Sequence, residues 1–222
     1  MRPVRTPENG PEWTVDHESP RISAGFKPTM RKCRSLLTGS SLGSVFLVGL
    51  LIAAAPTPQT AIDPDGKPVD PFAQASGKLV VLVFLRQDCP VSSRYAPVIQ
   101  QISSRFAHDA SFFLVYPDRN ESAPSIRKYL ADYGYALPAL RDPEHVLVKQ
   151  AHAEITPEAA VFNREGKLVY HGRIDNWYVE FGTSRPAPTT HELNDAIQAG
   201  IAGKPVANKA VKGVGCYISD LD

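Results

Sequence analysis

The sequence predicts a three-layer α/β domain, in which a mixed central sheet is covered by helices on both faces. Residues 78–86 form a continuous apolar and β-branched run, the pattern of a strand that is buried on both of its faces. Strand and helix patterns then alternate along the chain, and a hairpin pattern precedes the last helix. A chain with this order of elements builds a mixed sheet between two layers of helices.

The first half of the domain is predicted to contain two buried strands and three helices. The strands lie over 78–86 and 111–116, and the helices lie over 90–106, 124–133 and 144–153. Pro124 suits the first turn of its helix, and Gly134 suits the position after the end of that helix.

The second half is predicted to contain an antiparallel hairpin and a final helix. Two apolar stretches, 159–163 and 167–173, flank a short turn and predict the hairpin. Thr189 and Glu192 have the spacing of a capping box, which predicts a helix that continues through Ala202.

The composition excludes several classes of protein. The 222 residues carry 24 Lys and Arg against 23 Asp and Glu, so no basic excess indicates nucleic-acid binding. Twenty prolines exclude a long coiled coil. The predicted domain contains no methionine, so it lacks a thioether ligand for haem or Cu(I), and we predict neither a cofactor nor a metal site.

The N-terminal part of the chain has the pattern of a leader. Residues 1–29 are polar and rich in proline, and we expect them to be untranslated or disordered, with translation starting at Met30. A basic start and an apolar run over 45–55 predict that 30–61 is a signal peptide with a short linker. The run is shorter than the ~20 residues of a membrane span. We therefore expect export to the periplasm, with a retained N-terminal membrane anchor as the alternative.

Cys89 is the first candidate for chemistry. It follows the buried strand within three residues, and Pro90 suits the first position of the next helix. A cysteine at that place meets free backbone N–H groups and the positive end of the helix dipole, which both favour the nucleophilic thiolate. Asp88 would oppose ionisation if its carboxylate lay close, or it would relay protons. The alternative is an inert, buried cysteine.

Three stretches carry a family resemblance. Residues 88–97 resemble the active-site turn and first helix of the thioredoxin superfamily, in which a proline stands eight residues after the first cysteine. Residues 155–167 are similar to the family's cis-proline, strand and hairpin. Residues 65–69 resemble the N-terminal hairpin of exported thioredoxins and peroxiredoxins. The chain thus resembles a thioredoxin-like domain of the redoxin, or AhpC/TSA, type.

The resemblance implies an activity and a set of site residues. It implies a thiol–disulfide oxidoreductase that acts on protein or small-molecule thiols and disulfides, with an electron donor that the sequence does not identify. It implies a cis bond between Thr156 and Pro157, beside which a substrate peptide docks, and substrate-binding positions at Asp88 and Ser92. Ser92 replaces the second cysteine of the family's motif, so Cys89 is a single active-site cysteine.

The C-terminal tail, residues 204–222 after a domain over 62–203, carries a second cysteine. Cys216 lies 216 − 89 = 127 residues after Cys89, and its neighbouring glycines suit a mobile segment. A dozen residues at ~3.3 Å each are enough to recross a small domain. Our hypothesis is that Cys216 resolves an oxidised Cys89. The alternatives are a static disulfide with Cys89, a metal ligand, or a disulfide between chains.

Two other functions compete with thiol–disulfide exchange. A thiol peroxidase would act on peroxide, but the family's Pro and Thr or Ser, seven and three residues before the cysteine, are replaced by Leu82 and Arg86. A redox-inactive copper-binding or assembly protein would use Cys89 and Cys216, with His171 as a further ligand.

The remaining polar residues have weaker predictions. His145 and His152 are expected on a solvated helix face, with a metal pair as the alternative. Arg94 is expected in a surface salt bridge, with stabilisation of the thiolate as the alternative. One wall of the site is assigned to three residues after the hairpin, namely Arg173, Asp175 and Trp177.

Overall fold

The computed structural model describes residues 61–219 and 221. The predictions for 1–29 and for nearly all of the leader over 30–61, including the start at Met30, lie outside these residues. None of the helices within the described part has the length and apolar character needed to cross a membrane.

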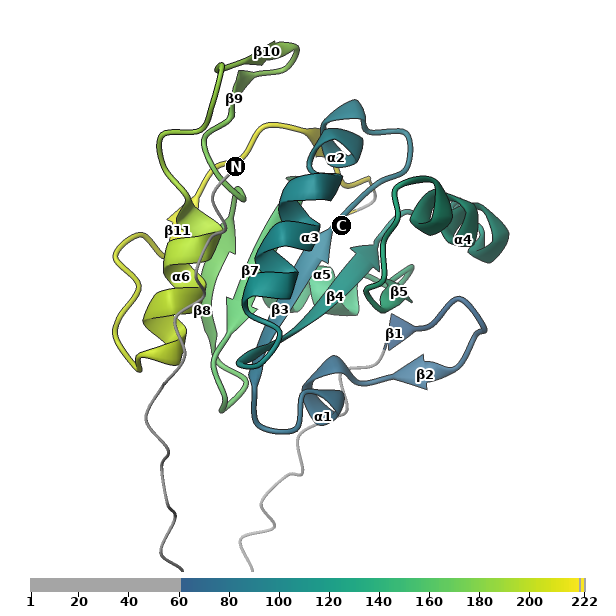
Figure 1. The fold of residues 1–222 in the computed structure, drawn as a ribbon. Coiled ribbons are helices and arrows are strands. Elements are labelled where there is room, and N and C mark those ends of the chain that lie inside the picture. Colours follow the sequence, from purple (N-terminus) through teal and green to yellow (C-terminus); the bar gives the residue numbers. More distant parts are fainter. Residues whose placement is uncertain (1–60, 220, 222) are drawn as a thin grey trace, which may run out of the picture. The chain divides into compact units, whose positions relative to one another are not determined.

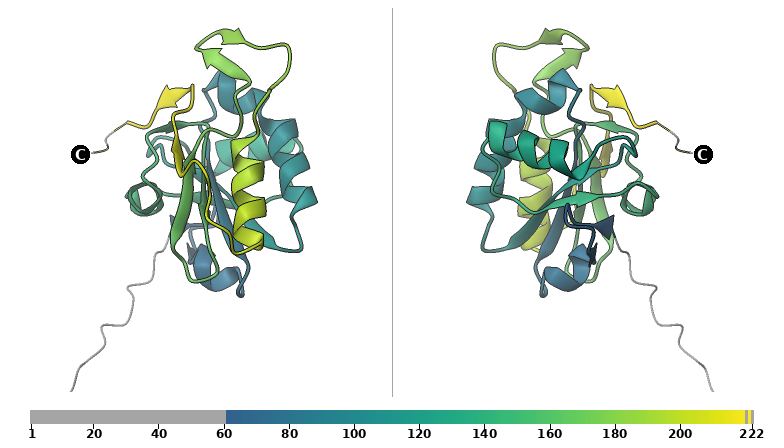
Figure 2. Two further views of the ribbon diagram at one scale, coloured as in Figure 1. Left: turned by 90° about the vertical axis from the view of Figure 1, so that its left-hand side faces the viewer. Right: turned by 90° about the vertical axis from the view of Figure 1, so that its right-hand side faces the viewer.

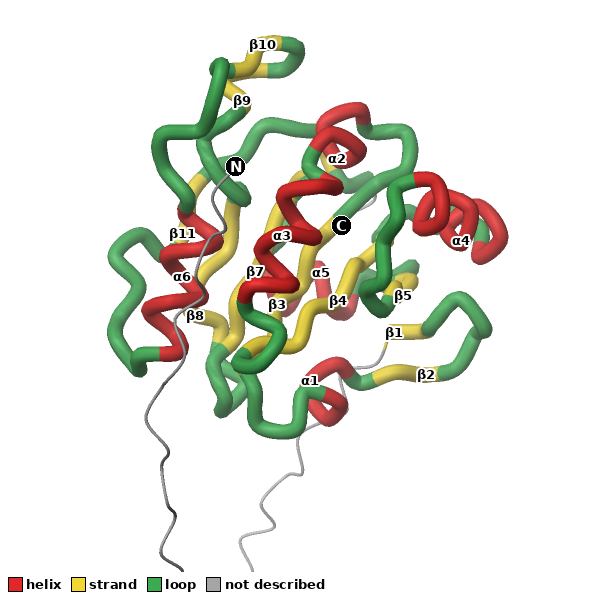
Figure 3. Tube along the Cα trace, in the orientation of Figure 1, coloured by secondary structure: helices red, strands yellow, loops and turns green. Residues whose placement is uncertain are grey.

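The described chain alternates short strands and helices (Figures 1 and 3). The helices are α1 (Pro71–Gln74), α2 (Pro90–Arg94), α3 (Ala96–Arg105), α4 (Ala123–Asp132), α5 (Val146–Ala151) and α6 (Glu192–Ile201). The longer strands are β3 (Leu79–Phe84), β4 (Ala110–Tyr116), β5 (Ala139–Arg141), β7 (Glu158–Phe162), β8 (Leu168–Gly172) and β9 (Tyr178–Glu180). The two-residue strands are β1 (Ala61–Ile62), β2 (Pro68–Val69), β6 (Ile155–Thr156), β10 (Thr183–Ser184), β11 (Ala210–Val211) and β12 (Cys216–Tyr217).

Eight strands form a mixed sheet in the order β11-β8-β7-β3-β4-β5-β1-β2. β3, β4 and β5 are parallel, whereas β7 runs antiparallel to β3 and forms the predicted hairpin with β8. β9 pairs with β10, and β12 pairs with β6, in two separate ladders. The prediction of a mixed sheet is confirmed.

Side chains of β3 alternate between two cores, one on each face of the sheet. Leu79, Val81 and Val83 pack with apolar residues of α3, α4 and α6. Val80 and Leu82 pack with residues of α5 on the opposite face. Figure 2 shows the resulting layers of helix, sheet and helix. The predicted three-layer fold is therefore present. It places the start of α2 at the carboxyl end of the central strand β3.

The helix predicted over 90–106 is two helices. α2 ends at Arg94 and α3 begins at Ala96, with Tyr95 between them. Pro97 has no N–H group and cannot donate to the carbonyl four residues earlier, which interrupts the helical ladder at this point.

The predicted capping box is wrong. The N-cap residue of α6 is His191, whose side chain makes no capping hydrogen bond. The Thr189 hydroxyl instead accepts a hydrogen bond from the Asn176 amide at 2.7 Å. Glu192 accepts from the Thr190 hydroxyl at 2.7 Å and is ion-paired with a distant arginine, so its carboxylate does not cap the helix.

The prediction that His145 and His152 lie on a solvated helix face is wrong for His145. His145 is 2% exposed, and its Nε2 lies 3.1 Å from the Pro117 carbonyl oxygen. Both histidines have a positive φ, and they bound α5 on its two sides. α5 is therefore shorter than the predicted helix over 144–153, because the chain turns at each histidine.

Candidate active site

Cys89 lies where the chain passes from β3 into α2. It is the N-cap residue of α2, with an extended backbone, and Pro90 takes the first helical position as predicted. The side chain is fully buried. Its sulfur lies 3.2 Å from the Thr156 carbonyl oxygen, to which the protonated thiol donates. Thr156 is joined to Pro157 by the predicted cis peptide bond. Residues 67 positions apart in the chain therefore meet at this sulfur.

The second cysteine reaches the same place from the C-terminal tail. β12 pairs antiparallel with β6, and in this ladder Cys216 lies opposite Thr156. The Thr156 hydroxyl donates to the Cys216 carbonyl oxygen at 3.3 Å, and the N–H of Ile218 donates to the Glu154 carbonyl at 2.9 Å. The two cysteine side chains are neighbours, and each shifts the pKa of the other. Both side chains are free thiols in this structure, and Cys216 packs against the apolar cluster that contains Cys89.

The two glycines that precede Cys216 differ in how closely they approach the rest of the protein. A Cβ atom at Gly215 would lie 2.0 Å from the Thr156 carbonyl oxygen, so only glycine fits there. A Cβ atom at Gly213 would lie 2.9 Å from the end of the Ile155 side chain. At Gly215 the tail approaches the backbone of β6 more closely than a side chain allows, which is a steric reason for this glycine.

Hydrogen bonds set the protonation of the two thiols in opposite directions. Burial alone raises the pKa of Cys89, but hydrogen bonds from the Cys216 side chain and from Ser92 outweigh it and lower this pKa below its ordinary value. Burial, together with the hydrogen bond to Cys89, raises the pKa of Cys216. Cys89 is therefore the more acidic thiol of the pair, and Cys216 loses its proton less readily.

The residues on either side of Cys89 have different environments. Ser92 is fully buried, and its hydroxyl oxygen accepts from the Arg86 N–H at 3.4 Å. Asp88 is exposed, and its carboxylate forms an ion pair with the Arg86 guanidinium at 2.7 Å. Arg86 also lies 3.3 Å from the Asp118 carboxylate. The Asp88 carboxylate is thus neutralised by Arg86, and Ser92 is the neighbour that acts on the sulfur.

Glu121 is a residue of this region that the sequence analysis missed. One carboxylate oxygen accepts from the N–H of Gln87 at 2.6 Å, two residues before Cys89. The other oxygen is buried and has no hydrogen-bond partner among the described residues. Burial raises the pKa of Glu121 to about 7. Its sequence context, Asp118-Arg119-Asn120-Glu121, has the pattern of an exposed turn, so no local signal identifies it.

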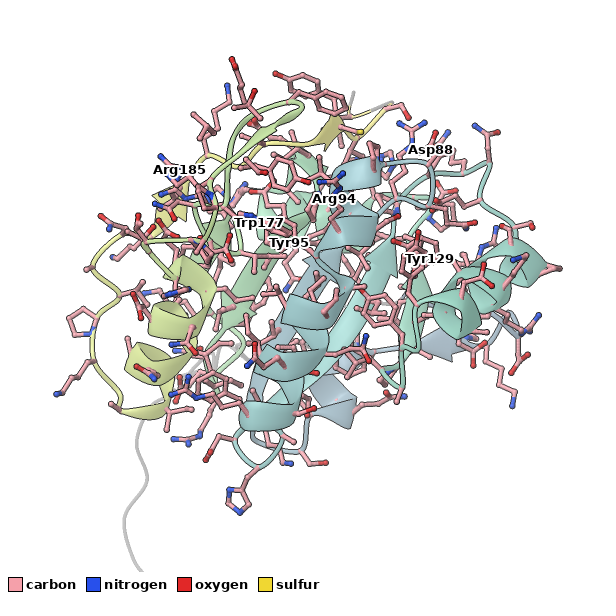
Figure 4. All side chains as sticks on the ribbon, turned by 45° about the horizontal axis from the view of Figure 1, so that its top comes forward. Asp88, Arg94, Tyr95, Tyr129, Trp177 and Arg185 are labelled. Atoms are coloured by element: carbon pink, nitrogen blue, oxygen red, sulfur yellow. The ribbon has the colours of Figure 1, made fainter. Side chains whose placement is uncertain are left out.

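The predicted wall of the site supports the start of α3. The Tyr95 hydroxyl donates to the Asp175 carboxylate at 2.5 Å, and the same oxygen accepts from the Trp177 N–H at 2.8 Å. The rings of Tyr95 and Trp177 pack edge to face with centroids 5.7 Å apart. Figure 4 labels these two residues near Arg94. Arg173 is ion-paired with Glu192. These residues hold the helix junction in place.

Arg94 and His171 do not join the two cysteines. Arg94 is exposed and forms no salt bridge with any residue of the described part, so the predicted surface ion pair is absent. His171 lies 3.5 Å from the Glu158 carboxylate, and its ring is near that of His152. Within residues 61–219, no group of three histidine, cysteine or acidic side chains is arranged to hold a metal ion.

Solved structures with a similar fold include proteins from several bacteria. A hypothetical protein from Sinorhizobium meliloti is 21% identical, with a TM-score of 0.59 over 72% of this chain and 88% of its own. An uncharacterized conserved protein from Geobacillus kaustophilus is 23% identical, with a TM-score of 0.59 over 72% of this chain and 86% of its own. A secreted Mycobacterium tuberculosis disulfide oxidoreductase is 19% identical, with a TM-score of 0.45 over 65% of this chain and 94% of its own.

The sequence comparisons agree with the fold. No curated protein matches the chain. The family model described as AhpC/TSA matches residues 53–171, more than half of the chain, and this range includes Cys89, Thr156 and Pro157. Cys216 lies beyond the matched range. The thioredoxin-like fold, the cysteine at the start of α2, the cis-proline beside it and the matched residues together show that the chain belongs to the AhpC/TSA family.

Proposed function

We propose that this protein is an exported thiol–disulfide oxidoreductase whose redox centre is the pair Cys89 and Cys216. The single observation that carries the proposal is that both cysteines meet at Thr156, since Cys216 lies opposite Thr156 in the β6–β12 ladder and the Thr156 carbonyl oxygen lies 3.2 Å from the Cys89 sulfur. Oxidation of the pair removes two electrons and two protons and forms one bond between the sulfurs. A substrate disulfide takes up the electrons and protons and becomes two thiols.

Cys89 is the nucleophile of the pair in this proposal. Its lowered pKa increases the share of the nucleophilic thiolate at a given pH, and a thiolate of low pKa is also a good leaving group when the disulfide is reduced. Thr156 positions Cys216 against it through the β6–β12 ladder, and Pro157 follows directly after this ladder. Asp88 and Ser92 flank Cys89, one exposed at the rim and one buried beside the sulfur. Export rests on the leader predicted over 30–61.

The proposal is tested by exchange with oxidised glutathione. The protein carries Cys33→Ser, which leaves Cys89 and Cys216 as its only cysteines. The reduced protein is expected to convert about one equivalent of oxidised glutathione to two of reduced glutathione and to lose both free thiols. Cys89→Ser and Cys216→Ser are each expected to stop at a mixed disulfide. Each of these variants has a single thiol and can lose only that one, so the two variants calibrate the thiol count.

Hydrogen peroxide provides the second arm of the same test, because a fully buried Cys89 is more open to a small oxidant than to a polypeptide. A peroxidase would form a sulfenic acid on Cys89 and release water when Cys216 condenses with it. Peroxide consumption much faster than glutathione exchange would favour the peroxidase over the proposed function.

A further inference from the structure

The two sulfurs of the redox pair differ in their access to solvent. Cys89 is fully buried, whereas Cys216 is only partly buried. β12 occupies the edge of β6 at Thr156, so a partner chain cannot add a strand at that edge while β12 is in place. The backbone of Gly215 packs against the Thr156 carbonyl at the same point. A partner that approaches from solvent therefore meets the sulfur of Cys216 first.

A cleft of about 450 Å³ borders the segment that carries Cys216. One side is the β9–β10 hairpin and the other is the tail on both sides of Cys216, at Gly215 and Tyr217. Figure 2 shows this hairpin projecting beyond the main sheet near the yellow C-terminal segment. The cleft therefore adjoins the segment that carries Cys216, with lining residues on both sides of this cysteine, although Cys216 itself does not line it.

Large apolar side chains are exposed around the cleft. Tyr217 is 68% exposed, Phe181 is 61% exposed and Val179 is 53% exposed, and all three line it. These are three of the six most exposed large apolar residues among those described. Exposed aromatic residues that gather at one place are typical of surfaces that bind other proteins.

The charges of the cleft favour an acidic partner. Arg185 and Lys212 line it, and neither has a carboxylate partner among the described residues. The guanidinium of Arg185 donates to the Asn176 carbonyl, which leaves its charge uncompensated. Glu180 is the acidic side chain of the lining, and its carboxylate accepts from the Thr183 hydroxyl. The lining therefore presents a net positive charge beside an apolar surface.

We infer that the cleft between β9–β10 and β12 is the docking site for a redox partner polypeptide, whose cysteine is flanked by acidic and aromatic side chains and exchanges with Cys216. This inference rests on the proposed function and adds to it the exchanging sulfur and the class of partner. It assigns the exchange with the partner to the Cys216 sulfur. Cys89 then only forms and breaks the disulfide with Cys216 inside the protein.

The steps balance in both directions. A partner thiolate attacks the Cys216 sulfur of the oxidised pair, and the bond between the two protein sulfurs breaks. The electron pair leaves on Cys89 as a thiolate, and the partner is held in a mixed disulfide with Cys216. A second partner thiolate then attacks the partner's own sulfur and releases Cys216, which takes up a proton. The partner is oxidised and the protein pair is reduced; the reverse sequence oxidises the pair.

The exchanging sulfur is tested with the oxidised full chain carrying Cys33→Ser. A peptide with one cysteine flanked by aspartate and phenylalanine is added in excess, the reaction is quenched with acid, and the free thiols are then alkylated. After tryptic digestion, the peptide is expected on residues 213–222 and the alkyl group on residues 87–94. Attachment of the peptide to 87–94 overturns the inference. If the starting material contains no disulfide between 89 and 216, the proposed function fails instead.

The docking site is tested by rates with the same peptide and with a control peptide in which lysine and serine replace its acidic and aromatic residues. The acidic aromatic peptide is expected to react about 3- to 10-fold faster, with an advantage that shrinks as salt is added. Lys212→Glu is expected to remove this advantage. Lys204→Glu makes the same change of charge outside the cleft and is expected to keep it. Equal rates for the two peptides, or equal effects of the two variants, overturn the docking site.

Discussion

Cys89 is surrounded by groups from three separate segments, of which one favours the thiol and two favour the thiolate. The Thr156 carbonyl accepts a hydrogen bond from the thiol, whereas Ser92 and Cys216 donate to the thiolate. Burial favours the neutral thiol, so the balance depends on the donors. The reactivity of this cysteine is therefore a property of its neighbours, and single substitutions of those neighbours change it.

Ser92→Ala removes one of these donors and is expected to raise the pKa of Cys89. The thiolate then loses a hydrogen bond while the thiol keeps its own, so ionisation becomes less favourable. The measurement is the ultraviolet absorbance of the thiolate as a function of pH in Cys33→Ser protein. Ser93→Ala is the matched control, because its hydroxyl lies 3.3 Å from that of Tyr129 and is not among the groups that bind the sulfur. A pKa unchanged by Ser92→Ala would show that this serine does not act on the thiolate.

The raised pKa of Glu121 predicts that the stability of the folded protein depends on pH. Its folded pKa of about 7 lies above its ordinary value of 4.5, so the folded protein binds this proton more tightly than the unfolded chain. The stability from this group is present at pH below about 4.5 and is lost as the pH rises through about 7. Glu121→Gln keeps the side chain neutral and still offers an oxygen to Gln87. Denaturant unfolding of both proteins is expected to show that the variant gains stability relative to the wild type as the pH rises from 5 to 8. Parallel curves of unfolding free energy against pH for the two proteins would contradict this prediction.

At the scale of elements, the two-stranded ladder of β6 and β12 determines whether the two sulfurs meet. Only two residues pair on each strand, so the ladder depends on the close approach of Gly215 to Thr156. Gly215→Ala forces these backbones apart. Because a misplacement of about 1 Å can slow a positioned reaction about a hundredfold, disulfide formation after addition of diamide is expected to slow by about that factor.

Gly213→Ala is the matched control for this prediction. Its new methyl group meets only the flexible end of the Ile155 side chain, which can move aside. Disulfide formation is expected to stay within about threefold of the wild type. Similar rates in the two glycine variants would show that the ladder does not position Cys216.

The elements also show which features a sequence can reveal. The strands β3 and β4 and the hairpin of β7 and β8 carry their own apolar patterns, so they were predictable. The two-residue strands β6, β11 and β12 have no local pattern, because they exist only through their partners across the fold.

The features of the site also divide into those that a sequence motif predicts and those that depend on long-range packing. Cys89 and the cis-proline at 157 follow from short motifs, and the sequence supports the contact with Cys216 only as one hypothesis among several. That contact depends on the path of a tail that crosses the domain, and the role of Glu121 depends on a loop that packs against Gln87. Long-range packing of this kind leaves no periodic signal in the chain.

At the scale of the whole molecule, a disulfide between Cys89 and Cys216 would join the start of α2 to the end of the described chain. The loop that it closes spans most of the domain, so it removes much of the freedom of the unfolded chain. We expect the oxidised protein to be more stable than the reduced protein by about 2–5 kcal/mol in denaturant unfolding. Cys216→Ser cannot form the link, and its stability is expected to be the same with and without reductant. A similar difference in that variant would refute the assignment to this disulfide.

The measurement that tests the central claim most directly is a disulfide map of the oxidised Cys33→Ser protein. The protein is oxidised at low concentration, alkylated and digested with trypsin without reduction, and its peptides are identified by mass spectrometry. We predict that residues 87–94 and 213–222 are recovered as one linked species within single chains, and that reduction separates them. Recovery of both peptides alkylated, or linked only between two chains, would contradict the claim that Cys89 and Cys216 form the redox pair of this protein.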